Sequence, residues 1–210
     1  AFSQLDGDNG SALYHITIGE KDAWGQGFGS EATQLMLDHA FGVLGLHRIA
    51  LFVFEFNERA IRAYQRCGFV MEGRSRESIF RDGRWWDELA MSVLESDWRR
   101  LKAEAAYQKA RLRVRSGDRA ASAGALLAIP ATFPNDSTPA ATALFLLADL
   151  YADRGVDDSA RALFLEAGTR YPLTTFGQRA AFQAAMIAHV GGDHAGVERV
   201  GRDAGAGRAP

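Results

Sequence analysis

A glycine-rich loop followed directly by a helical pattern is the feature that most limits what this chain can fold into. Residues 24–30 read WGQGFGS, and over residues 31–44 apolar side chains recur at three- and four-residue spacing, as in an amphipathic helix. Glycines let backbone N–H groups converge, and the following helix adds the positive end of its dipole. The pattern predicts a site for a pyrophosphate, although such runs also form ordinary helix-opening turns.

Strand patterns surround this segment. Residues 12–19, ALYHITIG, alternate in polarity, and the turn residues DGDNG at 6–10 precede them, so we expect a hairpin that ends in a strand. Residues 48–54, RIALFVF, are apolar on both faces and predict a strand buried inside a sheet. Two further strand patterns flank the turn at residues 81–84 and predict a closing β-hairpin.

A second, shorter helix is expected between these strands. Asn57 stands at a helix N-cap position, ERAIRAYQRC follows it, and Gly68 marks the end. Strands that alternate with helices in this way indicate the α/β fold class.

The composition and periodicity of the sequence change near Trp98, where we place a domain boundary. The chain beyond it is rich in Ala, Leu and Arg, with helical periodicity and almost no strand signal. One stretch, from Leu144 to Pro172, fits the spacing of a tetratricopeptide repeat without its leading Trp, with a fainter echo at residues 192–195 and a further helix turn at Gly117. We therefore expect a domain over residues 1–98, a tetratricopeptide-like helical segment over 99–200 and a flexible tail over 201–210.

Composition excludes several classes of function. Lys and Arg number 24 and Asp and Glu 26, so the net charge of −2 argues against a general electrostatic grip on nucleic acid or anionic lipid. No apolar run approaches the roughly 20 residues that span a bilayer, so no membrane span is predicted. The single Cys67 rules out an internal disulfide and a multi-cysteine metal site, so we expect no metal and a cytoplasmic location.

Taken together, the motifs of residues 1–98 resemble the GNAT superfamily of N-acetyltransferases, and most closely its Rim-type branch, which acts on ribosomal-protein N-termini. The likeness rests on ITIG, WGQGFGSEA, LGLHRIALFVFEFN and ERAIRAYQRCGF, and it continues through EGRSRESIFRDGRWWDELAMSVL. It implies a mixed central sheet with flanking helices and acetyl-coenzyme A as the co-substrate. The family's first strand and the two helices after it have no counterpart before Ala1, so we expect the N-terminal elements of the fold to be missing.

The resemblance also implies roles for individual residues. In the family, the strand that matches Ile16, Thr17 and Ile18 pairs with the pantetheine arm of the co-substrate, and the position that matches Asn57 hydrogen-bonds it. Tyr64 matches the residue that protonates the leaving thiolate, a role that suits a phenol with an ordinary pKa near 10. Pyrophosphate binding falls to the glycine-rich loop, and the cofactor-binding residues there are Trp24, Gly25, Gln26, Gly27, Phe28, Gly29 and Ser30.

Simpler alternatives remain open for these residues and for the general base. Asn57 can be a helix cap alone, and Tyr64 can be a core aromatic. Many family members carry Glu where this chain has Leu13, which leaves His15, a water relay or a residue from the missing elements as the base. Trp85 and Trp86 can line the acceptor site or belong to the core.

The resemblance therefore implies acetyl transfer from acetyl-coenzyme A to a primary amine by direct attack in a ternary complex. The acceptor can be a protein α-amino group, a polyamine or an aminoglycoside, and no residue separates these. The alternative is an interaction module that binds a protein partner through the helical segment and carries a vestigial acetyltransferase half.

Overall fold

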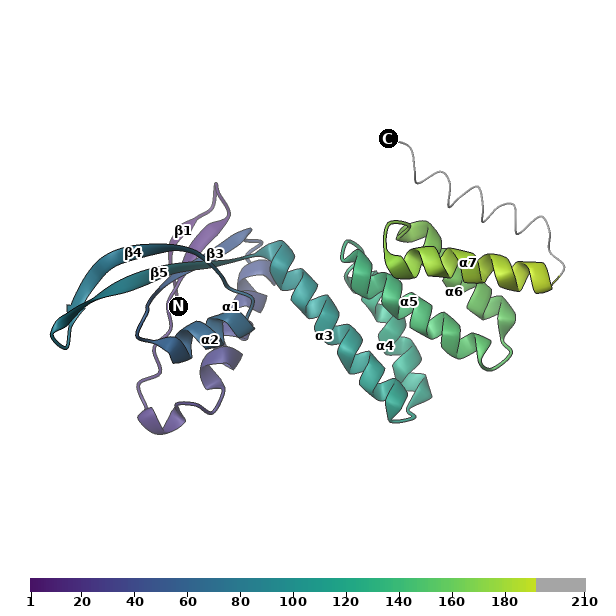
Figure 1. The fold of residues 1–210 in the computed structure, drawn as a ribbon, viewed down its shortest axis with the longest axis horizontal. Coiled ribbons are helices and arrows are strands. Elements are labelled where there is room, and N and C mark those ends of the chain that lie inside the picture. Colours follow the sequence, from purple (N-terminus) through teal and green to yellow (C-terminus); the bar gives the residue numbers. More distant parts are fainter. Residues whose placement is uncertain (192–210) are drawn as a thin grey trace. The chain divides into compact units, whose positions relative to one another are not determined.

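The computed structural model describes residues 1–191 and divides the chain into two compact units, Ala1–Leu101 and a second that begins at Lys102 (Figure 1). The first unit is an α/β domain and the second is built from helices, as the sequence predicts. The elements of the first unit, in chain order, are β1 (Phe2–Asp6), β2 (Ser11–Tyr14), a 3-10 turn η1 (Lys21–Ala23), α1 (Phe28–Gly42), β3 (Arg48–Phe54), α2 (Glu58–Arg66), β4 (Val70–Arg81) and β5 (Arg84–Leu94).

The five strands of the first unit form one mixed sheet in the order β1-β2-β3-β5-β4. Only β2 and β3 run parallel, and α1 lies on the connection between them, whereas the other three pairs are antiparallel. This arrangement confirms the predicted mixed sheet with helices and places β3 in its centre.

The core of this unit lies on one face of the sheet. Ile49, Leu51 and Val53 of β3 are buried there with residues of α1 and of β5, and α2 packs its Ile61 and Tyr64 against them. Burial of each such aliphatic side chain contributes about 1.5–3 kcal/mol. The expectation that residues 48–54 are buried on both faces is wrong, because Phe52 points to the opposite face and is 52% exposed.

The helix starts differ from expectation in one case and match it in the other. Helix α1 begins at Phe28 rather than at residue 31, because Gly27 serves as its N-cap and its carbonyl accepts from the backbone N–H groups of Ser30 and Glu31. Helix α2 begins after Asn57, as predicted, and the Asn57 side chain caps it.

Strand β2 is shorter than predicted. Its parallel pairing with β3 ends at Leu13 opposite Ala50, and the strand itself ends at Tyr14, so residues 15–19 lie outside the sheet. Strand β3 continues to Phe54 because β5 pairs with it along its whole length. The two strands therefore part, and residues 16–18 leave the sheet beside α1 and α2.

The closing hairpin forms as predicted. Asp82 and Gly83 both have positive φ, 53° and 80°, which matches the type I′ turn that suits the twist of paired strands. A register shift between Ser75 and Ile79 bulges β4 opposite β5.

A single helix, α3 (Glu95–Arg115), runs through the expected domain boundary. Trp98 belongs to the first unit, where its indole packs 5.5 Å from the Phe41 ring and donates to Asp38 Oδ1 at 2.8 Å. Ala110, further along the same helix, belongs to a core of the second unit. The structure thus divides the chain at residues 101–102, and independent folding of the two parts stays a prediction.

The second unit continues with four helices, α4 (Arg119–Thr132), α5 (Ser137–Ala152), α6 (Asp157–Arg170) and α7 (Thr175–Val190). Small residues fill much of its cores, including Ala140, Ala160 and Ala184. A turn with Gly117 separates α3 from α4, as expected, and the tetratricopeptide-like repeat stays a prediction. The echo at residues 192–195 and the tail at 201–210 lie outside the described residues. Within residues 1–191, no helix has the length and apolar character needed to cross a membrane.

Candidate acetyl-donor site

A pocket of about 560 Å³ opens in the first unit where β2 and β3 part. Its walls come from three segments: the chain after β2, the glycine-rich loop with the start of α1, and the β3–α2 turn with α2. It is lined by Ile16, Thr17, Ile18, Ala23, Trp24, Gly25, Gly27, Phe28, Gly29, Ser30, Phe56, Asn57, Arg59, Ala60, Ala63, Tyr64 and Arg66. The structure therefore brings together every predicted site residue except Gln26.

The first wall is an unpaired piece of backbone. Within the described chain, the backbone N–H groups of residues 16–18 make no hydrogen bond to protein. The carbonyl of Ile18 is already engaged, because the Trp24 indole donates to it at 2.8 Å. This segment can therefore pair with an extended ligand through its remaining groups, as the predicted role requires, and Trp24 fixes the loop against it.

The second wall is the start of α1. Gly27 has a φ of 92°, a conformation that costs other residues roughly 1–2 kcal/mol, and no side chain caps the helix. Because of this, the N–H groups of Phe28 and Gly29 find no acceptor within residues 1–191. Free amides at the positive end of a 15-residue helix form an anion-binding surface.

Gln26 is the predicted loop residue that the pocket leaves out. Its side-chain Nε2 turns back and donates to the Asp22 carbonyl at 2.5 Å. Its side chain therefore fastens the loop internally.

The third wall carries the polar groups of α2. The Asn57 side-chain oxygen accepts from the Ala60 backbone N–H at 3.3 Å, so Asn57 caps the helix and lines the pocket at once. This oxygen serves the cap, so the amide nitrogen is the group left to donate to a ligand.

Tyr64 lies further along α2 and is half-buried against Phe69, with the two ring centroids 5.7 Å apart. Burial, followed by the neighbouring Tyr14 and Cys67, raises the pKa of the Tyr64 hydroxyl above its ordinary value. The phenol therefore keeps its proton at neutral pH and can donate it to a developing thiolate.

Sequence reasoning missed the two arginines of the pocket. Arg59 and Arg66 come from α2, and the Arg59 guanidinium lies 4.3 Å from the centroid of the Trp24 ring, a cation–π contact. Their spacing with Ala63 places them on one helical face, but this spacing alone does not distinguish a ligand-binding face from any other charged face of a helix. Both cations can balance the charge of a bound phosphate.

The candidate base and the two tryptophans lie elsewhere. His15 is exposed outside the pocket, with its Nε2 2.6 Å from the Ser3 hydroxyl. Trp85 is 56% exposed and packs edge-to-face with Phe80 near the hairpin turn, away from the buried core. The Trp86 ring packs against that of Phe56, a pocket residue, with the two ring centroids 5.2 Å apart. Among the described residues, none next to Tyr64 therefore stands out as the general base for the amine.

Comparison with known proteins places the first unit in context. Residues 1–70 match the family model described as acetyltransferase (GNAT) domain. A spermidine N(1)-acetyltransferase of Vibrio cholerae is 38% identical over 88 residues, which cover 42% of this chain and 50% of the relative. The corresponding Escherichia coli enzyme is 31% identical over 74 residues, which cover 35% of this chain and 40% of the relative.

Solved structures include the Vibrio cholerae spermidine N-acetyltransferase in complex with CoA and spermine, at 34% identity and a TM-score of 0.43, covering 46% of this chain and 57% of that one. The chain spans about half the length, or less, of the curated relatives it matches. The match to the family model ends at residue 70 and so lies within the first unit.

Proposed function

We propose, from the premise that the first unit carries a GNAT acetyltransferase domain, that its pocket binds acetyl-coenzyme A and that the domain transfers the acetyl group to a primary amine. The observation that supports this most strongly is the joint lining of one pocket by the uncapped start of α1, two arginines, Asn57 and Tyr64. Phosphates, a polar arm and a thioester sulfur are the groups that this set can contact.

The donor binds in three parts under this proposal. The pyrophosphate lies at the N–H groups of the α1 start, with Arg59 and Arg66 balancing its charge. The pantetheine arm extends beside residues 16–18 and receives a hydrogen bond from the Asn57 amide. The thioester then lies toward Tyr64.

The transfer is a direct attack within the ternary complex. The neutral amine nitrogen attacks the thioester carbonyl carbon, so that a C–N bond forms and the C–S bond breaks. The Tyr64 hydroxyl gives its proton to the departing sulfur, and the amine's surplus proton leaves through water. The products are an N-acetylated amine and coenzyme A as the free thiol, after the phenolate regains a proton from solvent.

Among acceptors, a polyamine is the one that the named relatives favour, because two of them are spermidine acetyltransferases. A protein α-amino group, which the Rim-type likeness implies, is the alternative acceptor. We place the reaction in the cytoplasm, as the single free Cys67 led us to expect.

A second candidate function belongs to the helical unit. On α7, Phe182, Met186 and Val190 recur every four residues and are 65%, 45% and 82% exposed. Such a stripe on one helix face is typical of a surface that binds a protein partner.

Calorimetric titration of the full chain with coenzyme A tests the proposal directly. We expect one site per chain with roughly micromolar affinity. Release of free thiol on adding acetyl-coenzyme A and spermidine then tests the transfer, with an N-terminal peptide as the comparison acceptor. A titration without heat at millimolar ligand would overturn the donor site and leave the helical unit as the functional part.

A further inference from the structure

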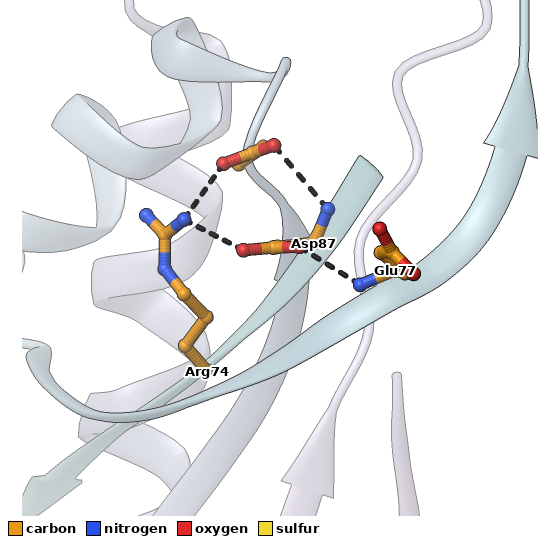
Figure 2. Close-up of polar contacts among 4 residues, drawn as sticks. Arg74, Glu77 and Asp87 are labelled. Atoms are coloured by element: carbon orange, nitrogen blue, oxygen red, sulfur yellow. Dashed lines mark hydrogen bonds and ion pairs between the residues drawn. The ribbon is translucent and has the colours of Figure 1, made fainter. Parts of the chain in front are cut away.

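A three-residue ionic network joins the β3–α2 turn to the β4–β5 hairpin. The Arg74 Nη1 atom donates to Glu55 Oε2 at 3.0 Å and to Asp87 Oδ2 at 2.7 Å (Figure 2). The side chains come from three different segments: β4, the β3–α2 turn and β5. One guanidinium therefore ties all three together.

Asp87 uses its second oxygen to hold the bulge of β4. Its Oδ1 accepts from the Glu77 backbone N–H at 2.8 Å, and Glu77 adopts a φ of 51° (Figure 2). A residue with a side chain rarely takes this conformation without a local reason. The Glu77 N–H and the Arg74 guanidinium together hold the pKa of Asp87 below its ordinary value, so the carboxylate stays charged.

Glu55 is bound to Asp87 through the backbone as well. Its N–H donates to the Asp87 carbonyl at 3.0 Å, and its Oε1 accepts from the Asp87 N–H at 3.3 Å. The next two residues along the chain are Phe56 and Asn57, which line the pocket. The Asn57 N–H closes the turn by donating to the Phe54 carbonyl at 2.9 Å.

We propose that Arg74, Glu55 and Asp87 are positioning residues that hold the β3–α2 turn, so that Phe56 and Asn57 face the donor pocket. The inference rests on the proposed function for its ligand, and on the network alone for its geometry. None of the three residues lines the pocket, so they act through the two that do.

The chain offers a matched control at the opposite end of β3, where the strand begins. Arg48 of β3 forms an ion pair with Glu72 of β4, and its Nη1 also donates to the Ser92 hydroxyl at 2.8 Å. Like the Arg74 network, this pair bridges strands of the sheet and is partly exposed, but neither residue lines the pocket or adjoins the turn. Loss of either arginine removes a cross-strand ion pair, and only loss of Arg74 should disturb the pocket.

Backbone hydrogen exchange of the ligand-free chain tests whether the network holds the β3–α2 turn. In Arg74→Met we expect the Asn57 and Ala60 amides to exchange about tenfold faster or more, because their acceptors belong to the turn. In Arg48→Met the same amides should exchange as in the wild type. Arg74→Lys should restore most of the protection, since one ammonium can reach both carboxylates, and Asp87→Asn provides a second disruption if Arg74→Met fails to fold.

Coenzyme A affinity, measured by calorimetry on the folded chain, tests the functional half. We expect a loss of roughly tenfold in Arg74→Met and less than twofold in Arg48→Met. Unchanged exchange in Arg74→Met, faster exchange with unchanged affinity, or equal losses in the two variants would each overturn the inference. A wild type that does not bind coenzyme A would overturn the proposed function instead, and the exchange measurement would still decide whether the network holds the turn.

Discussion

Helices α1 and α2 both begin at the edge of the same pocket, yet their N-termini are completed differently. Helix α2 has an Asn at its N-cap, and that side chain satisfies the Ala60 N–H. Helix α1 has a glycine there, which offers no side chain and leaves the first N–H groups without an acceptor among residues 1–191. A cap residue such as Ser or Asn at that position would ordinarily contribute about 0.5–2 kcal/mol of stability.

The difference indicates that the two helix starts serve different roles. The start of α1 forgoes the stability of a cap and keeps its amides available for an anion. Helix α2 is capped by Asn57 and packs its Ile61 and Tyr64 against the core, which holds Asn57 and Tyr64 in fixed places. We therefore expect changes in the loop to affect donor binding alone, whereas changes along α2 affect donor binding at Asn57 and chemistry at Tyr64.

The largest effect is expected for Tyr64→Phe. Loss of the hydroxyl removes the proton donor for the leaving thiolate, which typically contributes about 10²- to 10⁴-fold in rate. Coenzyme A affinity should change little, because the phenol acts in the transition state. Steady-state kinetics with acetyl-coenzyme A and spermidine, beside calorimetry with coenzyme A, measure the two quantities.

The raised pKa of Tyr64 adds a pH criterion to this test. Its hydroxyl should stay protonated to a higher pH than a free phenol, so any alkaline fall in rate caused by its ionisation should lie above about pH 10. Wild-type turnover in the Phe variant would remove Tyr64 from the mechanism and make α2 a purely structural helix.

Next in size is Gly27→Val. Valine would have to adopt the φ of 92° at a position that lines the pocket, so we expect at least roughly tenfold weaker coenzyme A binding. Gly45→Val is the matched control: Gly45 also has a positive φ, 64°, and open space where a Cβ would lie, but it does not line the pocket.

Thermal unfolding should show similar destabilisation of the two glycine variants, because the backbone strain is of the same kind. Affinity, corrected for the folded fraction, should fall only for Gly27→Val. Equal affinities would mean that these glycines only form turns.

A smaller effect is expected for Asn57→Asp. Aspartate keeps an oxygen for the Ala60 N–H, so the cap and the thermal stability should persist. The amide donor is replaced by a carboxylate, so coenzyme A should bind several-fold more weakly. If Asn57→Ala loses stability while Asn57→Asp retains full affinity, Asn57 serves only as a cap.

Gln26→Ala should have the smallest effect, less than about twofold in affinity, because the side chain bonds the Asp22 carbonyl rather than the pocket. The same titration measures it. A loss as large as that of Gly27→Val would show that loop closure, and not amide exposure, controls binding.

Local signals in the sequence predicted much of this arrangement. Asn57 marks the start of its helix because capping depends on adjacent residues, and the turn at Asp82-Gly83 follows from backbone preferences of two residues. The end of β2 at Tyr14 could not be predicted, because residues 15–19 keep a strand-like pattern and only the pairing of β3 with β5 shows where the two strands part.

Tertiary pairing also explains the site residues that were missed. Arg59 and Arg66 resemble the charged residues of any exposed helix face until α2 is placed beside the loop. The Arg74 network joins residues 19 and 13 positions apart along the chain, across a bulge that no local pattern marks.

The strand order has a consequence for synthesis of the chain on the ribosome. Every residue that lines the pocket lies between positions 16 and 66, whereas β5, the second neighbour of β3, begins at Arg84. At about 5–20 residues per second, β5 emerges on the order of seconds after Arg66. During that interval the apolar side chains of β3 have β2 beside them and no partner on the other edge, so the nascent domain is most open to misassembly just after its ligand-binding residues have appeared.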